Sequence, residues 1–362
     1  MFVENYGEIL DRITSWWYKE NIEPCIAFYI SKEAKAYSLK DANDFWPSPE
    51  VEPDLNSLAE YLVSEVGSRY YFGEALPSIP FLYGRRGTPA VMSHYLGGKV
   101  HFTCDTVWVS PIIERWDNFH IEYDEENYWF RIGIQFFETI VEKARDLYLP
   151  QLPPLGSDAL TCLSLLRGTE KLLFDLIDNI DTVIKVRDKI LELWPKYYKK
   201  YRDIYVKYYP GDNSWLVWAP GRLEVAECDF SVLLSPKLFE ELVVPQIVKI
   251  SEYVDYMMWH LDGPDEIKHL DVILDLPQIK AIQWVSGAGK PTAVHWIPML
   301  KKIQARGKSL IVYAENEKEV EILTEELSPE GLFIFGGFTG KTREEACEFV
   351  KKIKKHRRKV IK

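Results

Sequence analysis

Polar side chains that could do acid–base chemistry follow several short β-rich runs of this sequence. Four are carboxylates, one is a histidine, and two could bind or stack on a ligand: Asp105, Asp229, Asp262, Glu315, His260, Gln283 and Trp284. They come from separate parts of the chain. In a closed set of parallel strands the carboxyl ends meet at one mouth, where catalytic residues gather. We therefore expect these side chains to converge.

Several carboxylates around one imidazole can divide the roles of acid and base. Crowding raises the pKa of one carboxyl group while another stays ionised, and His260 can move a proton near neutral pH. We predict Asp105, His260 and Asp229 as catalytic residues, with Asp105 orienting the substrate or stabilising a developing positive charge. The residues predicted to position or wall in the substrate are Asp262, Glu315, Gln283, Trp108, Trp218 and Trp284.

Some of these residues also have a purely structural interpretation. Asp262 precedes Gly263-Pro264-Asp265, where a helix could begin, and would then be a helix N-cap. Glu315 likewise precedes a predicted helix. A histidine at a strand end, in contrast, is poorly placed to be simple core, so His260 is the residue for which the functional interpretation is strongest.

The elements that must position these residues are clearest in the C-terminal half. Runs typical of strands cover 254–259, 279–285, 309–314 and 332–335, and the segments between them have helical periodicity. This alternation predicts βα units and a parallel sheet.

The first half of the chain is less regular. Runs 22–30, 99–109 and 214–220 are further candidate strands, and 169–209 is predicted to be mostly helical, broken or kinked at Pro195. Residues 31–90 are rich in proline and indicate an insertion of loops and short helices over one end of a barrel. No linker composition divides the chain, so we predict a single domain over 1–362.

Composition excludes several classes of protein. The net charge of −11 argues against a surface that binds nucleic acid as a whole, and the basic end 351–362 is interpreted as a solvated helix end. The five cysteines are widely spaced without a CxxC pair, which indicates a reducing, cytoplasmic location without a disulfide framework or zinc ribbon. No segment is typical of a signal peptide or membrane span.

Four segments resemble the uroporphyrinogen decarboxylase family. CDFSVLLSPKLFEELVVPQIVKI (228–250) is similar to its strand end followed by Leu-Ser/Gly-Pro and a helix, and HFTCDTVWVSPIIE (101–114) places Asp105 on its catalytic aspartate. Segments 154–168 and 333–350 resemble its Gly-Ala-Pro-Trp-Thr region and its last strand and helix. The resemblance covers most of the chain after about residue 95. It implies an α/β fold, a (β/α)8 TIM barrel, here with an N-terminal loop and helix extension.

This sequence departs from the family pattern at positions that bind substrate. The arginine-bearing segment after the first strand is replaced by 27–37, whose lysines lack the bidentate fork of arginine. The family's substrate-contacting tyrosine falls near Ser164, its strand-eight histidine near Gly337, and a serine near Asp229. Ser164 is therefore added to the predicted substrate-binding residues. An acidic porphyrinogen would meet poor charge complementarity here.

The same superfamily contains zinc-dependent methyltransferases linked to corrinoids or thiols. Their His-x-Cys motif corresponds to His260-Leu261-Asp262, and their last cysteine falls near Gly337 or Phe338. Because a thiol-activating zinc needs soft ligands, we expect no zinc of that kind. A harder metal held by His260, Asp262 and Glu315 stays open.

The resemblance and the residues together predict an enzyme acting on a small molecule. Group transfer is favoured, in particular methyl transfer with a corrinoid protein as partner, or else a lyase reaction. The alternatives are a genuine uroporphyrinogen decarboxylase and a ligand-binding barrel for a carbohydrate or aromatic compound. A homodimer is compatible with this reading.

Overall fold

A seven-stranded, mostly parallel sheet organises the molecule. The computed structural model describes residues 5–32, 45–46, 48–83, 91–103, 107–215 and 217–357, so the predicted catalytic residue Asp105 lies outside the described residues. The strand order is β2-β1-β13-β12-β11-β10-β9, and only β2 runs antiparallel to its neighbour. The strands are β1 (Cys25–Ser31), β2 (Arg69–Gly73), β9 (Leu223–Ala226), β10 (Tyr256–Asp262), β11 (Ala281–Val285), β12 (Ser309–Ala314) and β13 (Leu332–Gly336).

Three small two-stranded sheets accompany the large one. They pair β3 (Ser78–Ile79) with β6 (Leu149–Pro150), β4 (Lys99–Phe102) with β5 (Val107–Ser110), and β7 (Asp212–Ser214) with β8 (Val217–Ala219). The first pair is parallel and the other two are antiparallel hairpins. Among the described residues no backbone ladder joins the edge strands β2 and β9 to these pairs. The α/β class is confirmed, whereas hydrogen bonds do not close the expected barrel.

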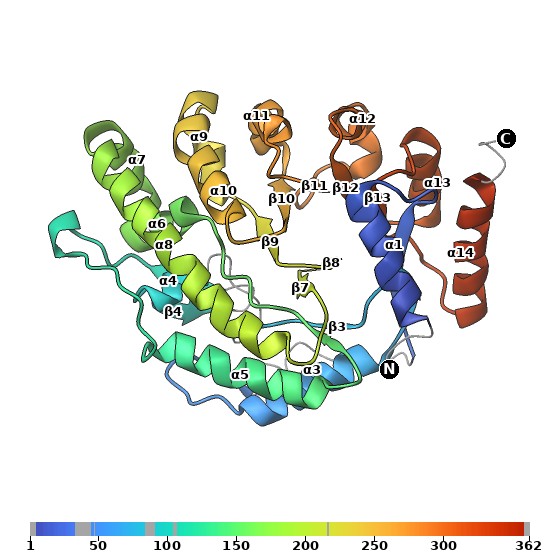
Figure 1. The fold of residues 1–362 in the computed structure, drawn as a ribbon, viewed down its shortest axis with the longest axis horizontal. Helices are drawn as coiled ribbons and strands as arrows, with labels where there is room; N and C mark the ends of the chain where they lie inside the picture. Colours follow the sequence, from blue (N-terminus) through green and yellow to red (C-terminus); the bar gives the residue numbers. More distant parts are fainter. Residues whose placement is uncertain are drawn as a thin grey trace.

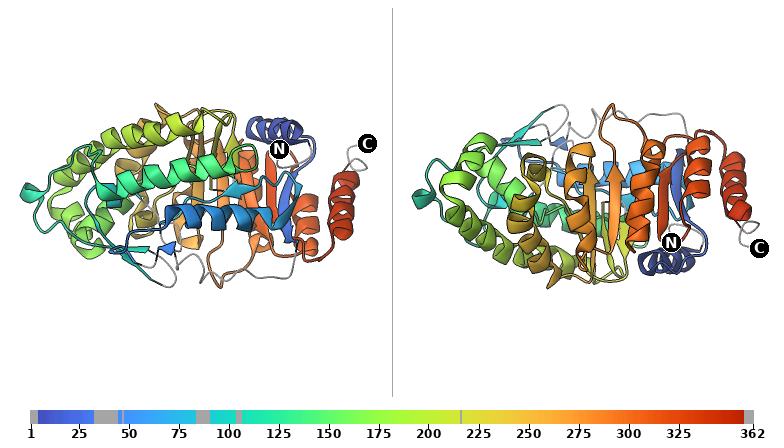
Figure 2. Two further views of the ribbon diagram at one scale, coloured as in Figure 1. Left: turned by 90° about the horizontal axis from the view of Figure 1, so that it is seen from below. Right: turned by 90° about the horizontal axis from the view of Figure 1, so that it is seen from above.

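Helices cover the outer face of the sheet, and further helices lie beyond one end of it (Figure 1). The longer helices are α1 (Tyr6–Tyr18), α3 (Leu55–Gly67), α5 (Tyr128–Ala144), α6 (Ala159–Arg167), α7 (Thr169–Asp178), α8 (Ile180–Tyr205), α10 (Val244–Ser251), α12 (Ile297–Ala305), α13 (Glu317–Glu326) and α14 (Arg343–Arg357). The short ones are α4 (Met92–Tyr95), α9 (Pro236–Leu242), α11 (Leu270–Asp275), η1 (Trp116–Asn118), η2 (Asp229–Leu233), η3 (Pro264–His269) and η4 (Ala293–Trp296). Helices α9 to α13 form an arc outside β9 to β13 (Figure 1). Helices α7 and α14 lie at opposite ends of the molecule (Figure 2).

The sheet has two buried faces because both are covered. On one face Met257, Trp259, Ile282 and Val312 pack against the arc of helices. On the other face Ala27, Met258, Ile311 and Phe333 pack with residues of α1. Near-continuous apolar runs, rather than alternating ones, follow from burial on both faces, which explains why the C-terminal strands are easy to locate in the sequence.

Helix α1 closes the edge of the sheet where the parallel strands begin. The Trp16 indole donates to Gly331 O (2.9 Å), Ser309 Oγ donates to Trp16 O (2.8 Å), and the Trp17 indole donates to Trp218 O (2.9 Å). Gly331 and Ser309 stand at the starts of β13 and β12. The opposite edge, where these strands end, is therefore the one left for a site.

Three sequence predictions change in the structure. Run 99–109 is not a strand of the main sheet, because β4 and β5 pair with each other as a hairpin, with Val100 opposite Val109. Run 214–220 is likewise not one strand of that sheet, because its residues belong to the antiparallel pair of β7 and β8, with Ser214 opposite Val217. Pro195 lies inside α8, which continues to Tyr205 instead of breaking there. No helix in the described part of the chain is long and apolar enough to span a membrane.

Candidate active site at the strand ends

Three side chains from neighbouring strands form a hydrogen-bonded chain at the end of the sheet. His260 lies opposite Gln283 in the register of β10 and β11, and Tyr313 lies on the next strand, β12. His260 Nδ1 is 2.7 Å from Gln283 Oε1, and Gln283 Nε2 donates to the Tyr313 hydroxyl at 2.7 Å. Since an amide oxygen only accepts, Nδ1 carries a proton, and in the neutral imidazole the lone pair is then on Nε2. The imidazole is thus held as a proton acceptor.

Trp215 packs against the imidazole from the loop between β7 and β8. The two ring centroids are 4.7 Å apart, and Trp215 has a left-handed backbone with φ of 52°. A bulky residue rarely adopts this conformation, and such strain tends to occur at functional sites. The contact limits how the His260 ring can turn.

Carboxyl groups gather at the ends of β9 and β10, near His260. Glu227 and Asp229 follow β9, and Asp262 ends β10. Burial, reinforced by the Asp262 charge, raises the pKa of Asp229, while the nearby imidazole of His260 opposes that rise. Burial and the charge of Asp229 raise the pKa of Glu227 well above its ordinary value. Two carboxyl groups with raised pKa values, Glu227 and Asp229, therefore lie at the strand ends near one base.

Glu266, at the start of the next helical turn, fixes the position of Asp262. Its carboxyl group accepts from the Ser231 hydroxyl (3.1 Å) and from the Asp262 backbone N–H (3.1 Å). Burial raises its pKa to about 8. The residue that caps η3 is Gly263, with φ of 86°, and no side chain caps that turn. Asp262 is therefore not a helix cap, and its carboxylate remains exposed at the mouth.

A cavity of about 540 Å³ opens beside Tyr313. Aromatic side chains supply much of its wall, and Arg69, Gln151 and Ser78 supply polar groups. The Arg69 guanidinium lies over the ring of Tyr29 at 4.3 Å. This size and lining suit a small molecule with a flat apolar body and one anionic group. The aromatic members are Phe28, Tyr29, Tyr71, Tyr313, Phe335 and Phe338.

The structure assigns different places to the residues predicted to bind substrate. Gln283 holds both His260 and Tyr313, so its polar atoms are occupied. Trp284 and the exposed Glu315 line a smaller cavity of about 130 Å³, which Tyr313 shares. Asp229 and Asp262 stand beside His260, as described above.

Three predicted residues lie elsewhere. Trp218 is buried near α1, at the edge where the strands begin, and its indole donates to Pro210 O (2.8 Å). Ser164 is buried in α6, where its hydroxyl donates to Thr161 O (2.8 Å). Neither Trp218 nor Ser164 lines the cavity beside Tyr313, and their contact with a substrate stays a prediction. Trp108 is exposed on the hairpin strand β5, and no described contact joins it to His260.

Sequence reasoning missed Tyr313, Arg69, Glu227 and Trp215. Alternation along the predicted strand 309–314 could have indicated Tyr313, because it lies two residues after Ile311 on the same face. Arg69 belongs to the antiparallel edge strand β2, which lies inside the proline-rich insertion, and nothing in the local sequence connects it with the strand ends.

The residues present do not fit a zinc ion of the methyltransferase type. Asp262 stands in place of the first cysteine, and Gly337 stands near the last one. A Cβ added to Gly337, whose φ is 81°, would approach Val320 Cγ2 to about 2.2 Å, so a cysteine could not be placed there without movement. In the described part of the chain no three His, Cys, Asp or Glu side chains are arranged to hold a metal.

Comparison with known proteins finds a likeness in fold but none in sequence. No protein family and no curated protein matches the sequence. Among solved structures, a methyltransferase from Methanosarcina mazei superposes with a TM-score of 0.59 and 12% identity, over 96% of this chain and 98% of that one. The two chains thus share a fold over nearly their full lengths. At this identity, function has to be argued from the site.

Proposed function

We propose that this protein is a group-transfer enzyme acting on a small molecule at the strand-end mouth, and that the group is methyl. The observation that carries the proposal is the chain His260–Gln283–Tyr313, which ends in the aromatic cavity. It supplies an oriented base at one end and a phenol hydroxyl at the other. The fold shared with a methyltransferase supports methyl as the transferred group.

The proposed step needs a proton acceptor and a bound acceptor molecule. The acceptor X–H gives its proton to His260 Nε2, and the lone pair left on X forms the new bond to the methyl carbon. The donor leaves with the electron pair of the bond that it had to that carbon. The imidazolium that results is stabilised by the carboxylates of Asp229 and Asp262, whose charges act within the same mouth.

The aromatic cavity beside Tyr313 would select the ligand. Arg69 would pair with an anionic group, and the aromatic wall would stack on a flat body. A methylcorrinoid presented by a partner protein is the donor that the sequence resemblance implies. Uroporphyrinogen decarboxylation is less favoured, because a multiply charged porphyrinogen would meet one arginine and a group of carboxylates.

The test is a methyl-transfer assay with methylcobalamin as donor and a panel of thiols and phenols as acceptors, followed by corrinoid absorbance. We expect turnover with at least one acceptor, and we expect His260→Ala to lower kcat by about 10² to 10⁴, the range typical for loss of a general base. His120→Ala removes an exposed histidine and serves as the matched control.

Two outcomes would count against the proposal. The first is equal activity of the His260→Ala and His120→Ala variants with an identified acceptor. The second is thermal stabilisation by sugars alone, without any methyl transfer, since a ligand that binds the folded state raises its stability by mass action. That second result would identify a carbohydrate-binding protein instead.

A further inference from the structure

A second, basic groove runs along the edge strand β2, between α1 and α14. Its volume is about 600 Å³. Both helices lie at the same end of the molecule, next to the edge of the sheet (Figure 1). Six of the side chains that line the groove are cations: Arg12, Lys32, Arg69, Arg343, Lys351 and Lys354. The chain as a whole carries a net charge of −11. The groove is therefore positively charged on a protein whose overall charge is negative.

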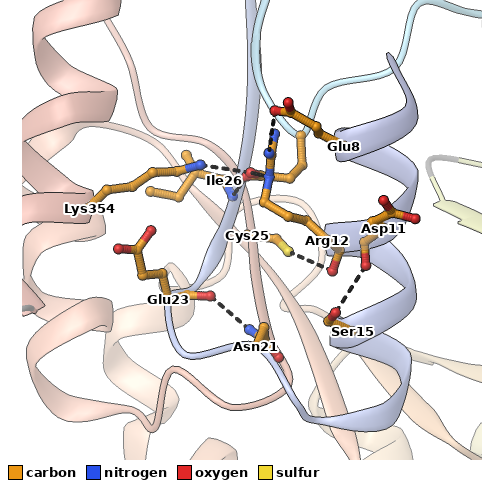
Figure 3. A network of polar contacts seen from close by, with 10 residues as sticks. Glu8, Asp11, Arg12, Ser15, Asn21, Glu23, Cys25, Ile26 and Lys354 are labelled. Carbon is orange, nitrogen blue, oxygen red and sulfur yellow. Dashed lines mark hydrogen bonds and ion pairs between the residues drawn. The ribbon is translucent and has the colours of Figure 1, made fainter. Parts of the chain in front are cut away.

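Structural ion pairs account for part of this charge. The buried carboxylate of Glu74 accepts from Arg12 Nε (2.6 Å), Lys354 Nζ (2.8 Å) and the Ile26 backbone N–H (2.7 Å). Figure 3 shows Arg12 of α1 and Lys354 of α14 reaching toward each other across β1. One carboxylate therefore holds two cations, and Glu8, at 3.9 Å from Arg12, is the carboxylate that lines the groove itself. The base of the groove keeps excess positive charge.

The outer cations have no such compensation. Arg343 and Lys351 make no ion pair with any carboxylate among the described residues, although both line the groove. The Arg343 guanidinium and the Lys32 ammonium each lie 5.2 Å from the ring centroid of Tyr70. Lys32 Nζ also donates to Gly67 O (2.7 Å). Tyr70 thus holds two cations in place before any ligand arrives.

We propose that this groove binds a small molecule that carries two or more phosphate groups. Guanidinium groups match phosphate oxygens with paired hydrogen bonds, and three arginines line this space. Arg12 already pairs with Glu74 and Glu8, and Arg69 pairs with Glu65 (3.6 Å), so among the described residues Arg343 is the arginine without an ion pair. The volume falls within the range of small-molecule sites, about 300–1,000 Å³. The groove differs from the strand-end cavity in most of its lining but adjoins it, because both are lined by Arg69 and Tyr71 of β2.

The experiment is calorimetric titration of the full chain with inorganic pyrophosphate, ADP and tricarballylate at low salt. We expect pyrophosphate and ADP to bind and tricarballylate to bind much more weakly. The double variant Arg343→Gln/Lys351→Gln should weaken pyrophosphate binding by at least about tenfold, because charge-assisted hydrogen bonds are lost. The control Lys301→Gln/Lys352→Gln changes the net charge equally at exposed lysines that pair with Glu326 and Glu321 of α13, away from the groove.

The result distinguishes specific phosphate binding in the groove from general attraction of anions to a positively charged surface. Tighter binding of ADP than of pyrophosphate would indicate a nucleotide, and equal binding would indicate the phosphates alone; either supports the proposal. It is overturned if neither phosphate compound binds, if tricarballylate binds as tightly, or if both double variants lose affinity to the same extent. None of these readouts depends on methyl transfer, so failure here is distinguishable from failure of the proposed activity.

Discussion

At the scale of single residues, the role of Gln283 is the clearest departure from expectation. It was predicted as a substrate ligand, yet its amide oxygen bonds to His260, its amide nitrogen bonds to Tyr313, and the side chain is buried. A residue in this position determines which imidazole nitrogen holds the proton. We interpret Gln283 as a positioning residue that orients the base without touching the ligand.

This interpretation predicts the effect of Gln283→Leu. The change keeps most of the volume but removes both hydrogen bonds, so the imidazole can turn and change its tautomer. We expect kcat for the proposed reaction to fall while KM stays nearly constant, because orientation of the base matters mainly in the transition state. Stability should fall by about 1–3 kcal/mol, since buried polar partners are left unpaired.

A matched substitution elsewhere tests whether the loss of kcat and stability is specific to the position of Gln283. Gln135→Leu alters an exposed glutamine of α5 and should leave both kcat and stability unchanged. If Gln283→Leu raises KM strongly and leaves kcat unchanged, Gln283 contacts the substrate after all and the positioning role is wrong.

At the scale of elements, α1 is the part that decides which end of the sheet is open. Trp16 is fully buried and joins the starts of β12 and β13 through its own carbonyl and indole N–H. The helix covers the Ala27, Met258 and Ile311 face from that edge. Without it, apolar side chains at the beginning of the strands would face water.

We therefore expect Trp16→Ala to cost about 3–5 kcal/mol of unfolding free energy, the range for truncating a buried aromatic residue. Trp108→Ala is a suitable comparison, because Trp108 is 58% exposed and such changes usually stay within about 0.5 kcal/mol. Urea unfolding followed by circular dichroism measures both. Similar midpoints for the two variants would mean that α1 adds little to the fold.

At the scale of the whole molecule, buried acids link stability to pH. Burial raises the pKa of Asp158 to about 6, of Glu224 to about 7 and of Glu266 to about 8. Each carboxyl group accepts hydrogen bonds from nearby groups: Asp158 from the first turn of α6, Glu224 from Ser157 N, and Glu266 from Ser231 and Asp262. These hydrogen bonds lower the pKa of each acid, but by less than burial away from water raises it.

The sign of the pH effect follows from these raised values. The folded chain keeps protons that the unfolded chain releases near pH 4, so the stabilisation is complete below that pH and is lost as pH rises through 6, 7 and 8. We expect the urea midpoint to fall between pH 5 and pH 8.5. Glu266→Gln should flatten the upper part of that decline, because the amide keeps the shape without ionising. A midpoint that rises over this interval would contradict the assignment.

Local sequence determined the class of fold and several points of the site. Strand 309–314 was located as the structure has it, and His260 and Asp262 were correctly placed at a strand end. A strand that is buried on both faces is a continuous run of apolar residues, so it can be located from the local sequence alone. The mostly helical stretch predicted over 169–209 was likewise found, as the two helices α7 and α8, and Pro195 lies inside α8 without ending it.

Tertiary structure alone decided which side chains meet. In run 99–109, β4 and β5 pair with each other. Trp218 lies at the α1 edge, and Arg69 reaches the mouth from the antiparallel edge strand β2. The contact between His260, Gln283 and Tyr313 depends on the register of three strands that are separated in the chain. Register is set by how whole strands pack against their neighbours, and this information is absent from the residues around any one position.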